Sequence, residues 1–265
     1  MKKITAIIVC IMLTLGAFAQ DDAQRVGINV RVGLGGSTLM LPQMSKATLA
    51  TNGYDASQKM KIGGTAGLLA DIKLKGNWSL QAGVMYSMQR FTQRQTSVFT
   101  DTASIHYSLS TDNTYKTHRL RVPVMVAYHF AGEKNHFSVA AGLYADAALA
   151  GDIAYDASAV ITPQHGPESK YVLGGNFDPF KKDVKYLYYN IADDSHVGKY
   201  NLYDGNLLNR FDLGASVEVG YHISKLYIGL QANFGLLDMT NKGYFKPNYV
   251  ERNFNFNLLL GYKIN

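Results

Sequence analysis

The chain has one cysteine among its 265 residues, and this Cys10 lies in the apolar N-terminal segment. Its rarity excludes a disulfide framework or a cysteine-ligated metal site in the rest of the protein. Beyond residue 19, no apolar run approaches the roughly 20 residues that a membrane-spanning helix needs. Long runs of Lys or Arg are also missing, and the formal net charge of +6 is spread along the chain. We therefore expect no nucleic-acid partner.

The N-terminus has the three parts of a secretory signal peptide. Two lysines precede an apolar segment at 4–15, and the small-x-small cleavage signal Ala-Phe-Ala follows at 17–19. We expect residues 1–19 to be a signal peptide and residues 20–265 to form one domain. Lipid attachment at Cys10 is the alternative, and the apolar residues that continue beyond this cysteine disfavour it.

Eight segments of the remaining chain alternate apolar and non-apolar residues. In one of them Leu213, Val217 and Val219 fall on one face, and Glu218 falls on the other. A strict period of two indicates a β-strand with one apolar face. The segments lie near residues 26–34, 64–74, 78–90, 120–130, 137–145, 213–223, 226–236 and 254–264.

The connections between these segments alternate between short and long. The long ones cover about 35–63, 92–117, 151–209 and 237–252. Loops beyond a dozen residues are uncommon in compact domains, whereas this alternation is typical of outer-membrane barrels with short periplasmic turns. We predict an all-β fold: a monomeric eight-stranded antiparallel transmembrane up-and-down β-barrel in the outer membrane. Its long extracellular loops include 151–209, between strands five and six.

A soluble β-sandwich or lipocalin-like barrel also has strands of period two, but its apolar face is the core. Three features favour a face that meets lipid. The segments are as long as membrane-spanning strands, and the last of them can close the barrel against the first. Aromatic residues of the apolar face also gather at both ends, with Trp78, Phe130 and Tyr262 near short turns and Phe91 and Phe234 near long loops.

The polar face of the strands forms the interior of the predicted barrel. It carries Arg31, Asp71, Arg121, Asp146 and Glu218. An eight-stranded barrel is just wide enough to be filled by side chains, and an isolated buried ion is costly. We expect an ion-pair network in which Arg31 and Arg121 are neutralised by Asp71 and Glu218. A water-filled lumen that hydrates each charge separately is the alternative.

Three short motifs together resemble the PorT-like outer-membrane β-barrel family, a relative of the small OmpA/OmpX-type barrels. They are Ala-Phe-Ala-Gln at 17–20, His-Arg-Leu-Arg-Val-Pro-Val at 118–124 and Leu-Gly-Tyr-Lys-Ile at 260–264. The resemblance implies an eight-stranded outer-membrane barrel, usually without an assigned activity, and some relatives serve protein secretion. Pro123 of the second motif lies inside the fourth predicted strand, where its missing N–H requires a bulge or a local break.

The third long connection is the part where we expect activity, because it is rich in tyrosine. Tyrosine-rich loops with Asn, Gly and Ser make adaptable binding surfaces. We expect this loop to contact a protein partner, a glycan or lipopolysaccharide; the alternative is that it covers the barrel mouth or extends the hairpins. The candidate binding residues are Tyr171, Tyr186, Tyr188, Tyr189, Tyr200 and Tyr203.

Catalysis is not expected. His106 precedes Ser108 by two residues, as a base and a nucleophile on one strand face would, but His222 and Ser224 repeat this spacing at a short turn. The acidic residues of the third long connection do not have calcium-loop spacing, so we expect no metal and no cofactor. We predict an outer-membrane protein with a structural or binding role, or an accessory of secretion or surface assembly, in contact with lipid and lipopolysaccharide. The alternatives are a small channel and a lipid-modifying enzyme.

Overall fold

The computed structural model describes residues 26–40, 54–100, 104–130, 135–181, 186–189, 197–200, 208–239 and 251–264. The expected signal peptide and Tyr203 lie outside these residues. In the described part, no helix is long and apolar enough to cross a membrane. The strands are β1 (Val26–Met40), β2 (Tyr54–Lys73), β3 (Trp78–Thr100), β4 (His106–His129), β5 (Asn135–Thr162), β6 (Ser169–Phe177), β7 (Tyr186–Tyr189), β8 (Val197–Tyr200), β9 (Phe211–Ile223), β10 (Leu226–Gly235) and β11 (Arg252–Lys263).

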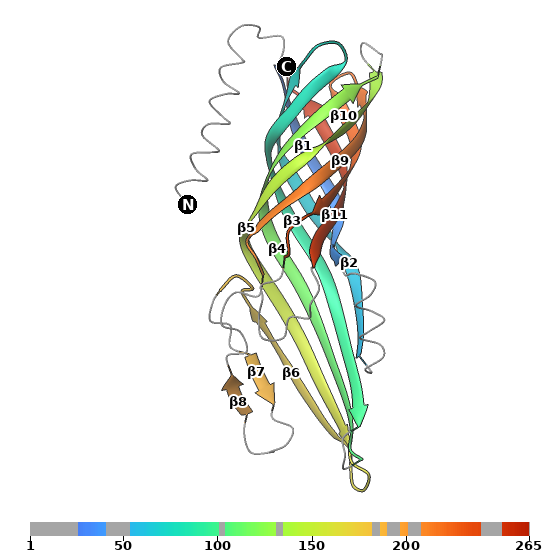
Figure 1. The fold of residues 1–265 in the computed structure, drawn as a ribbon, viewed down its shortest axis with the longest axis vertical. Helices are drawn as coiled ribbons and strands as arrows, with labels where there is room; N and C mark the ends of the chain where they lie inside the picture. The colour runs from blue at the N-terminus through green and yellow to red at the C-terminus, as the bar shows by residue number, and fades with distance from the viewer. Residues whose placement is uncertain are drawn as a thin grey trace.

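Eight strands form a closed antiparallel ring in the order β1-β2-β3-β4-β5-β9-β10-β11 (Figure 1). The ring closes between β1 and β11, which pair from Asn29–Lys263 to Met40–Arg252. The remaining neighbours in the ring are consecutive in the chain, except for β5 and β9, which flank the third long connection. The predicted eight-stranded barrel is confirmed.

The outside of the barrel is apolar and its inside is polar. Side chains such as Leu143 and Leu260 are 64% and 54% exposed, whereas Arg31 and Asn233 are buried. The outward apolar positions of β4 and of Phe130, which directly follows it, run from 120 to 130, which is about 33 Å along a strand and about 25 Å in height at the usual tilt. That height matches the apolar band of a membrane barrel. The soluble alternatives, whose apolar face forms the core, do not fit this arrangement.

Four strands continue well past the apolar band on one side. β2, β3, β4 and β5 contain 20, 23, 24 and 28 residues, and β6 pairs along the outer part of β5 (Figure 1). We call this side of the barrel the extended end, and the side of the short connections the turn end. The connection expected at 92–117 is therefore largely a β-hairpin, paired out to Thr100–His106. Its apolar alternation ends at the edge of the band, but its backbone pairing does not.

Phe91 does not belong to the outward aromatic residues, so that part of the prediction is wrong. Its side chain is buried and stacks on Tyr115, with ring centroids 4.4 Å apart. Odd-numbered residues of β3, such as Gln81 and Ser87, point inward, and Phe91 shares their parity. Trp78 and Phe130 are exposed at the turn end as expected.

Pro123 interrupts one of the two ladders of β4, as expected. The β3–β4 ladder pairs Ala82 with Val124 and Met85 with Arg121, without a pair between them and without a change of register. On the other side of β4, Pro123 lies opposite Tyr144 in the unbroken part of the β4–β5 ladder. The missing N–H is thus accommodated by a local break and not by a bulge.

Glycines on the inner wall make room for two large tyrosines. A methyl carbon built on Gly220 or Gly229 would overlap the ring or hydroxyl of Tyr227, and one built on Gly214 would overlap the ring of Tyr144. Both tyrosines are buried against the wall. Glycine is therefore needed at these positions because the two tyrosine rings lie so close to the backbone of the wall.

We expect Gly229→Ala to destabilise the barrel, because the buried Tyr227 must leave its position. Overpacking of this kind costs about 1–3 kcal/mol. The measurement is the free energy of unfolding of the refolded protein in detergent, by urea titration. Gly64→Ala is the matched control, since its new methyl carbon would have only one neighbour, at 3.8 Å. Equal losses in the two variants would contradict the close-packing argument.

Candidate functional site

Buried ion pairs and hydrogen bonds cross the barrel interior. On the side nearer the turn end, Arg31 of β1 is paired with Glu218 of β9, and both are buried. Glu218 also accepts hydrogen bonds from the Tyr227 hydroxyl at 2.6 Å and from Nε2 of Gln231 at 3.0 Å. The Arg31 guanidinium lies over the Tyr227 ring, 4.2 Å from its centroid. This cluster joins β1, β9 and β10.

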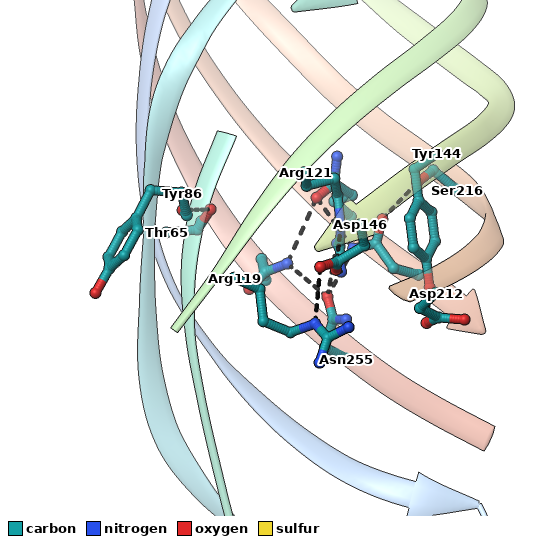
Figure 2. A network of polar contacts seen from close by, with 12 residues as sticks. Thr65, Tyr86, Arg119, Arg121, Tyr144, Asp146, Asp212, Ser216 and Asn255 are labelled. Atoms are coloured by element: carbon teal, nitrogen blue, oxygen red, sulfur yellow. Dashed lines mark hydrogen bonds and ion pairs between the residues drawn. The ribbon is translucent and has the colours of Figure 1, made fainter. Parts of the chain in front are cut away.

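A second charged cluster lies nearer the extended end and is centred on Asp146 (Figure 2). Arg119 Nε donates to Asp146 Oδ1 at 2.7 Å, and Arg121 Nη2 donates to Asp146 Oδ2 at 2.9 Å. Arg121 also lies 4.2 Å over the ring of Tyr144, whose hydroxyl donates to Asp212 at 3.2 Å. One carboxylate thus serves two buried guanidinium groups, with Asp212 close by.

Amide side chains connect the two clusters. Asn233 Nδ2 donates to Gln231 Oε1 at 3.1 Å and to Asn255 Oδ1 at 2.8 Å. Asn255 Oδ1 accepts from Arg121 Nη1 at 3.3 Å, and Gln231 donates to Glu218. The chain of contacts runs from Glu218 to Arg121, and these side chains occupy the interior. We call the two clusters with these amides the interior network.

The structure brings some predicted partners together and separates others. Arg31 contacts Glu218, as expected, but Arg121 is bound by Asp146 and not by Asp71 or Glu218. The reason is register, because Arg121 and Asp146 lie directly opposite each other on β4 and β5. Asp71 lies at the turn end, 3.7 Å from Nε2 of His129. In the Arg31–Glu218 and Arg121–Asp146 pairs the charges are in direct contact and are not hydrated separately.

The structure adds Arg119, which the sequence analysis did not single out. Its side chain is fully buried. A signal was present, because Arg119 has the same parity as Arg121 and therefore falls on the same face. The bulge between His118 and Arg119 in the β4–β5 ladder places Arg119 opposite Ala148.

At the extended end, apolar side chains cover the mouth of the barrel. Phe180, which follows β6, packs among these apolar side chains, and the guanidinium of Arg210 lies 4.8 Å over the Phe180 ring. The backbone N–H of Leu208 donates to the carbonyl of Pro179 at 3.1 Å. Part of the third long connection thus folds over the mouth. We call this group the mouth cluster; its buried members are Leu39, Phe91, Tyr115, Ala148, Ile153, Phe180, Leu208 and Met239.

The rest of the third long connection, in its described part, is largely β-structure. Tyr171 lies in β6, where it pairs with Ala159 of β5. The candidate tyrosines of β7 and β8 share one small hairpin, in which Tyr186 pairs with Tyr200 and Tyr188 with Gly198. Tyr189 pairs with Val197 in the same hairpin. The binding role of these tyrosines stays a prediction.

Neither His-x-Ser pair is arranged as a base and nucleophile. His106 Nδ1 lies 2.7 Å from the hydroxyl of Thr100 on the neighbouring strand. His222 Nε2 lies 3.2 Å from the hydroxyl of Ser138. Each histidine is therefore engaged by a residue outside its own motif.

Three basic residues of neighbouring strands lie at one level, just beyond the apolar band. Lys61 pairs with Arg90, and Arg90 pairs with Lys116, so the three occupy one level of β2, β3 and β4. Neighbouring strands are about 4.8 Å apart, which puts these residues within about 10 Å along the row. The next residue in the row is Asp152 of β5, opposite Lys116. We call Lys61, Arg90 and Lys116 the basic row.

Farther out on the same face, a cation and an anion neutralise each other. Arg94 donates to Asp112 through Nε at 2.7 Å and through Nη2 at 2.8 Å. These hydrogen bonds hold the pKa of the Asp112 carboxyl below its usual value. The basic row, by contrast, has three cations and one neighbouring anion, Asp152, and keeps an excess of positive charge at the edge of the apolar band.

Residues 18–241 match a protein family described as the outer membrane protein β-barrel domain. A comparison with curated proteins finds no match. Similar solved structures include Ail, the attachment invasion locus protein of Yersinia pestis, in complex with the heparin analogue sucrose octasulfate, at 10% identity and a TM-score of 0.31. The alignment covers 91% of this chain and 99% of Ail. Neisserial surface protein A (NspA) aligns at 8% identity and a TM-score of 0.33, over 90% of this chain and 97% of NspA.

We expect Asp146→Asn to destabilise the barrel strongly, because it leaves Arg119 and Arg121 buried without an anionic partner. Removing one partner of a buried ion pair costs about 3–5 kcal/mol. The free energy of unfolding in detergent measures the loss. Asp152→Asn removes the same charge from an exposed position on β5 and is the matched control. A loss no larger than that of the control would show that the interior network does not depend on this ion pair.

Proposed function

Because this chain belongs to the outer membrane protein β-barrel domain family, we propose that it is a surface-binding protein anchored by a closed barrel. The observation that carries the proposal is the length of β2–β5. A strand spans the membrane with about 9–11 residues, whereas these four contain 20–28. The additional residues build a sheet beyond the membrane, where a partner outside the cell can be reached.

The interior supports an anchor and not a channel. The interior network fills the middle of the barrel, and the mouth cluster covers its extended end. A solute would have to break buried ion pairs such as Arg31–Glu218 to pass. The histidine of each His-x-Ser motif contacts a hydroxyl group outside the motif, so the geometry of these motifs does not support catalysis.

Among the described strands, the sheet beyond the barrel has two edges that suit binding. β6 pairs with β5 along one side, and the pairing of β2 with β1 ends at Lys61–Ser37. An exposed strand edge can accept a strand from a partner through backbone hydrogen bonds. Val172 of β6 is 72% exposed, and Tyr171 lies next to it. We propose that the binding surface is the β6 edge with the tyrosines of β7 and β8, and that the partner is a protein or a glycan.

Lipopolysaccharide is the second proposed contact, and the basic row supports it. Anionic groups of outer-leaflet lipids lie at the membrane edge, which is the level of Lys61, Arg90 and Lys116. The apolar side chain beside this row, Ile62, is 74% exposed and suited to contact with acyl chains. Together these residues present positive charge directly above an apolar surface.

We also propose that the chain is PorT-like and serves secretion or surface assembly as an accessory. Within the motif at 118–124, Arg119 and Arg121 belong to the interior network and Pro123 is buried in β4. These roles give a structural reason for the motif in a barrel of this kind. Export through a signal peptide at 1–19 and a monomeric state belong to the same proposal.

We expect a trimmed variant to lose its partner while its barrel stays folded. The variant replaces residues 157–173 with a two-residue Asn-Gly turn between Asp156 and Gly174, which pair across β5 and β6. The measurement is co-purification from detergent-extracted outer membranes after cross-linking. As a control, residues 96–110 are replaced with the same Asn-Gly turn between the paired residues Gln95 and Thr111. An unchanged set of partners in the first variant would contradict binding through the β6 edge.

We expect the triple variant Lys61→Gln, Arg90→Gln, Lys116→Gln to bind lipopolysaccharide more weakly. Each basic residue near an anionic lipid surface contributes about 1 kcal/mol, so the expected loss is roughly 100-fold. The measurement is the affinity of fluorescent lipopolysaccharide for the protein in nanodiscs of neutral lipid.

The control for this variant removes the same amount of charge at the turn end. Lys73, Lys75 and Lys225 are exposed there and are changed to Gln together. The control should keep its affinity for lipopolysaccharide. Equal losses in the two triple variants would mean that net charge, and not the basic row, determines binding.

A further inference from the structure

Three histidines meet inside the barrel at the turn end. His129 ends β4, His136 lies at the start of β5, and His222 is near the end of β9. These strands are neighbours in the ring, and His136 lies directly opposite His222. One ring nitrogen from each histidine lies within 4.8 Å of the others, and all three side chains are half-buried.

The spacing of the three rings is close to that of a metal site. His129 Nδ1 lies 3.1 Å from His136 Nε2, and the rings of His136 and His222 stack with centroids 4.5 Å apart. In a tetrahedral zinc site with bonds of about 2.0–2.1 Å, ligand nitrogens are about 3.4 Å apart. Small rotations of these side chains can therefore direct three nitrogens at one ion.

Hydroxyl groups hold the outer nitrogens of two of the rings. His129 Nε2 lies 2.9 Å from the hydroxyl of Ser79, and His222 Nε2 lies 3.2 Å from the hydroxyl of Ser138. Metal-bound histidines usually have such a partner on the nitrogen that does not bind the ion, which fixes their orientation. Nδ1 of His129 and His222 is then left for an ion.

A buried polar atom beside the rings points to a bound ion. Oδ1 of Asp71 has no hydrogen-bond partner in the described part of the chain. Buried polar atoms are normally satisfied, and an ion is one of the ordinary explanations when they are not. The other carboxylate oxygen of Asp71 lies 3.7 Å from His129 Nε2. Asp71 is thus placed to support a bound cation, either directly or through His129.

We propose that His129, His136 and His222 bind one divalent transition-metal ion, of the class that prefers imidazole ligands and includes Zn²⁺. Arg31, Lys73 and Lys263 lie near enough to act on His129, so a cation held only by charge attraction is disfavoured. Imidazole bonds to zinc, copper or nickel do not depend on net negative charge in this way. Three protein ligands leave a fourth position open to water or to Asp71. Bound metal would fasten β4, β5 and β9 together at the turn end.

Titration of the untagged mature protein in detergent with Zn²⁺ tests the site by isothermal calorimetry. We expect one ion per barrel, with Ni²⁺ and Cu²⁺ also binding and Mg²⁺ not binding. His136→Gln and His222→Gln should each weaken Zn²⁺ binding at least tenfold, since even the outer partners of a metal site contribute about 10–100-fold. His118→Gln is the matched control, because this histidine contacts Tyr86 on the outer surface.

A second measurement uses the unchanged protein and so does not depend on the folding of variants. Diethylpyrocarbonate modifies accessible histidines, and mass spectrometry reads each site. Zn²⁺ should protect His129, His136 and His222 and leave His106 and His118 reactive. Three results would each overturn the proposal. They are a failure of the protein to bind Zn²⁺, Zn²⁺ binding that is unchanged in His136→Gln and His222→Gln, and equal protection of all histidines.

Discussion

The structure depends on the pairing of β1 with β11. In lipid, a backbone N–H or C=O without a partner costs several kcal/mol, and water cannot replace the missing bond. The β1–β11 ladder removes the two edges that an open sheet of eight strands would leave in the membrane. Once the ring is closed, each strand has one face toward lipid and one toward a narrow interior. The apolar outside and polar inside follow from this constraint.

A closed ring of eight strands also determines how the interior can be filled. Its bore holds side chains and little else, so each inward charge needs a partner within the same small volume. The inner-wall glycines belong to this solution, since Tyr227 and Tyr144 lie flat where a larger side chain would exclude them. Each of these rings also stacks against an arginine and donates to a carboxylate. Aromatic packing and ion pairing are therefore combined in the same residues.

The alternation of apolar and polar residues was enough to predict the barrel, its strand number and the polarity of each face. These three properties depend only on the order of residues along each strand. Contacts between side chains of different strands depend on the register in which the strands pair, and the sequence of one strand does not determine that register. For that reason Arg121 could be placed inside but its partner Asp146 could not be identified. The outer parts of β3 and β4 escaped prediction because apolar and polar residues do not alternate regularly there. The three histidines were missed because they share no local motif: each lies at the turn end of a different strand, and only the register of β4, β5 and β9 puts them at one level.

The continuity of the long strands gives the protein a mechanical property. The β3–β4 ladder runs from Trp78–Tyr128 at the turn end to Thr100–His106 at the far tip, and its only interruption is at Pro123. A pull on the tip, along the strands, draws β3 and β4 together and loads the β2–β3 and β4–β5 ladders on either side in shear, so that their hydrogen bonds do not open one after another. Tension on the tip would therefore be shared by these two ladders and passed into the membrane-embedded ring. Pairing on both sides thus makes the hairpin resist extension from the barrel.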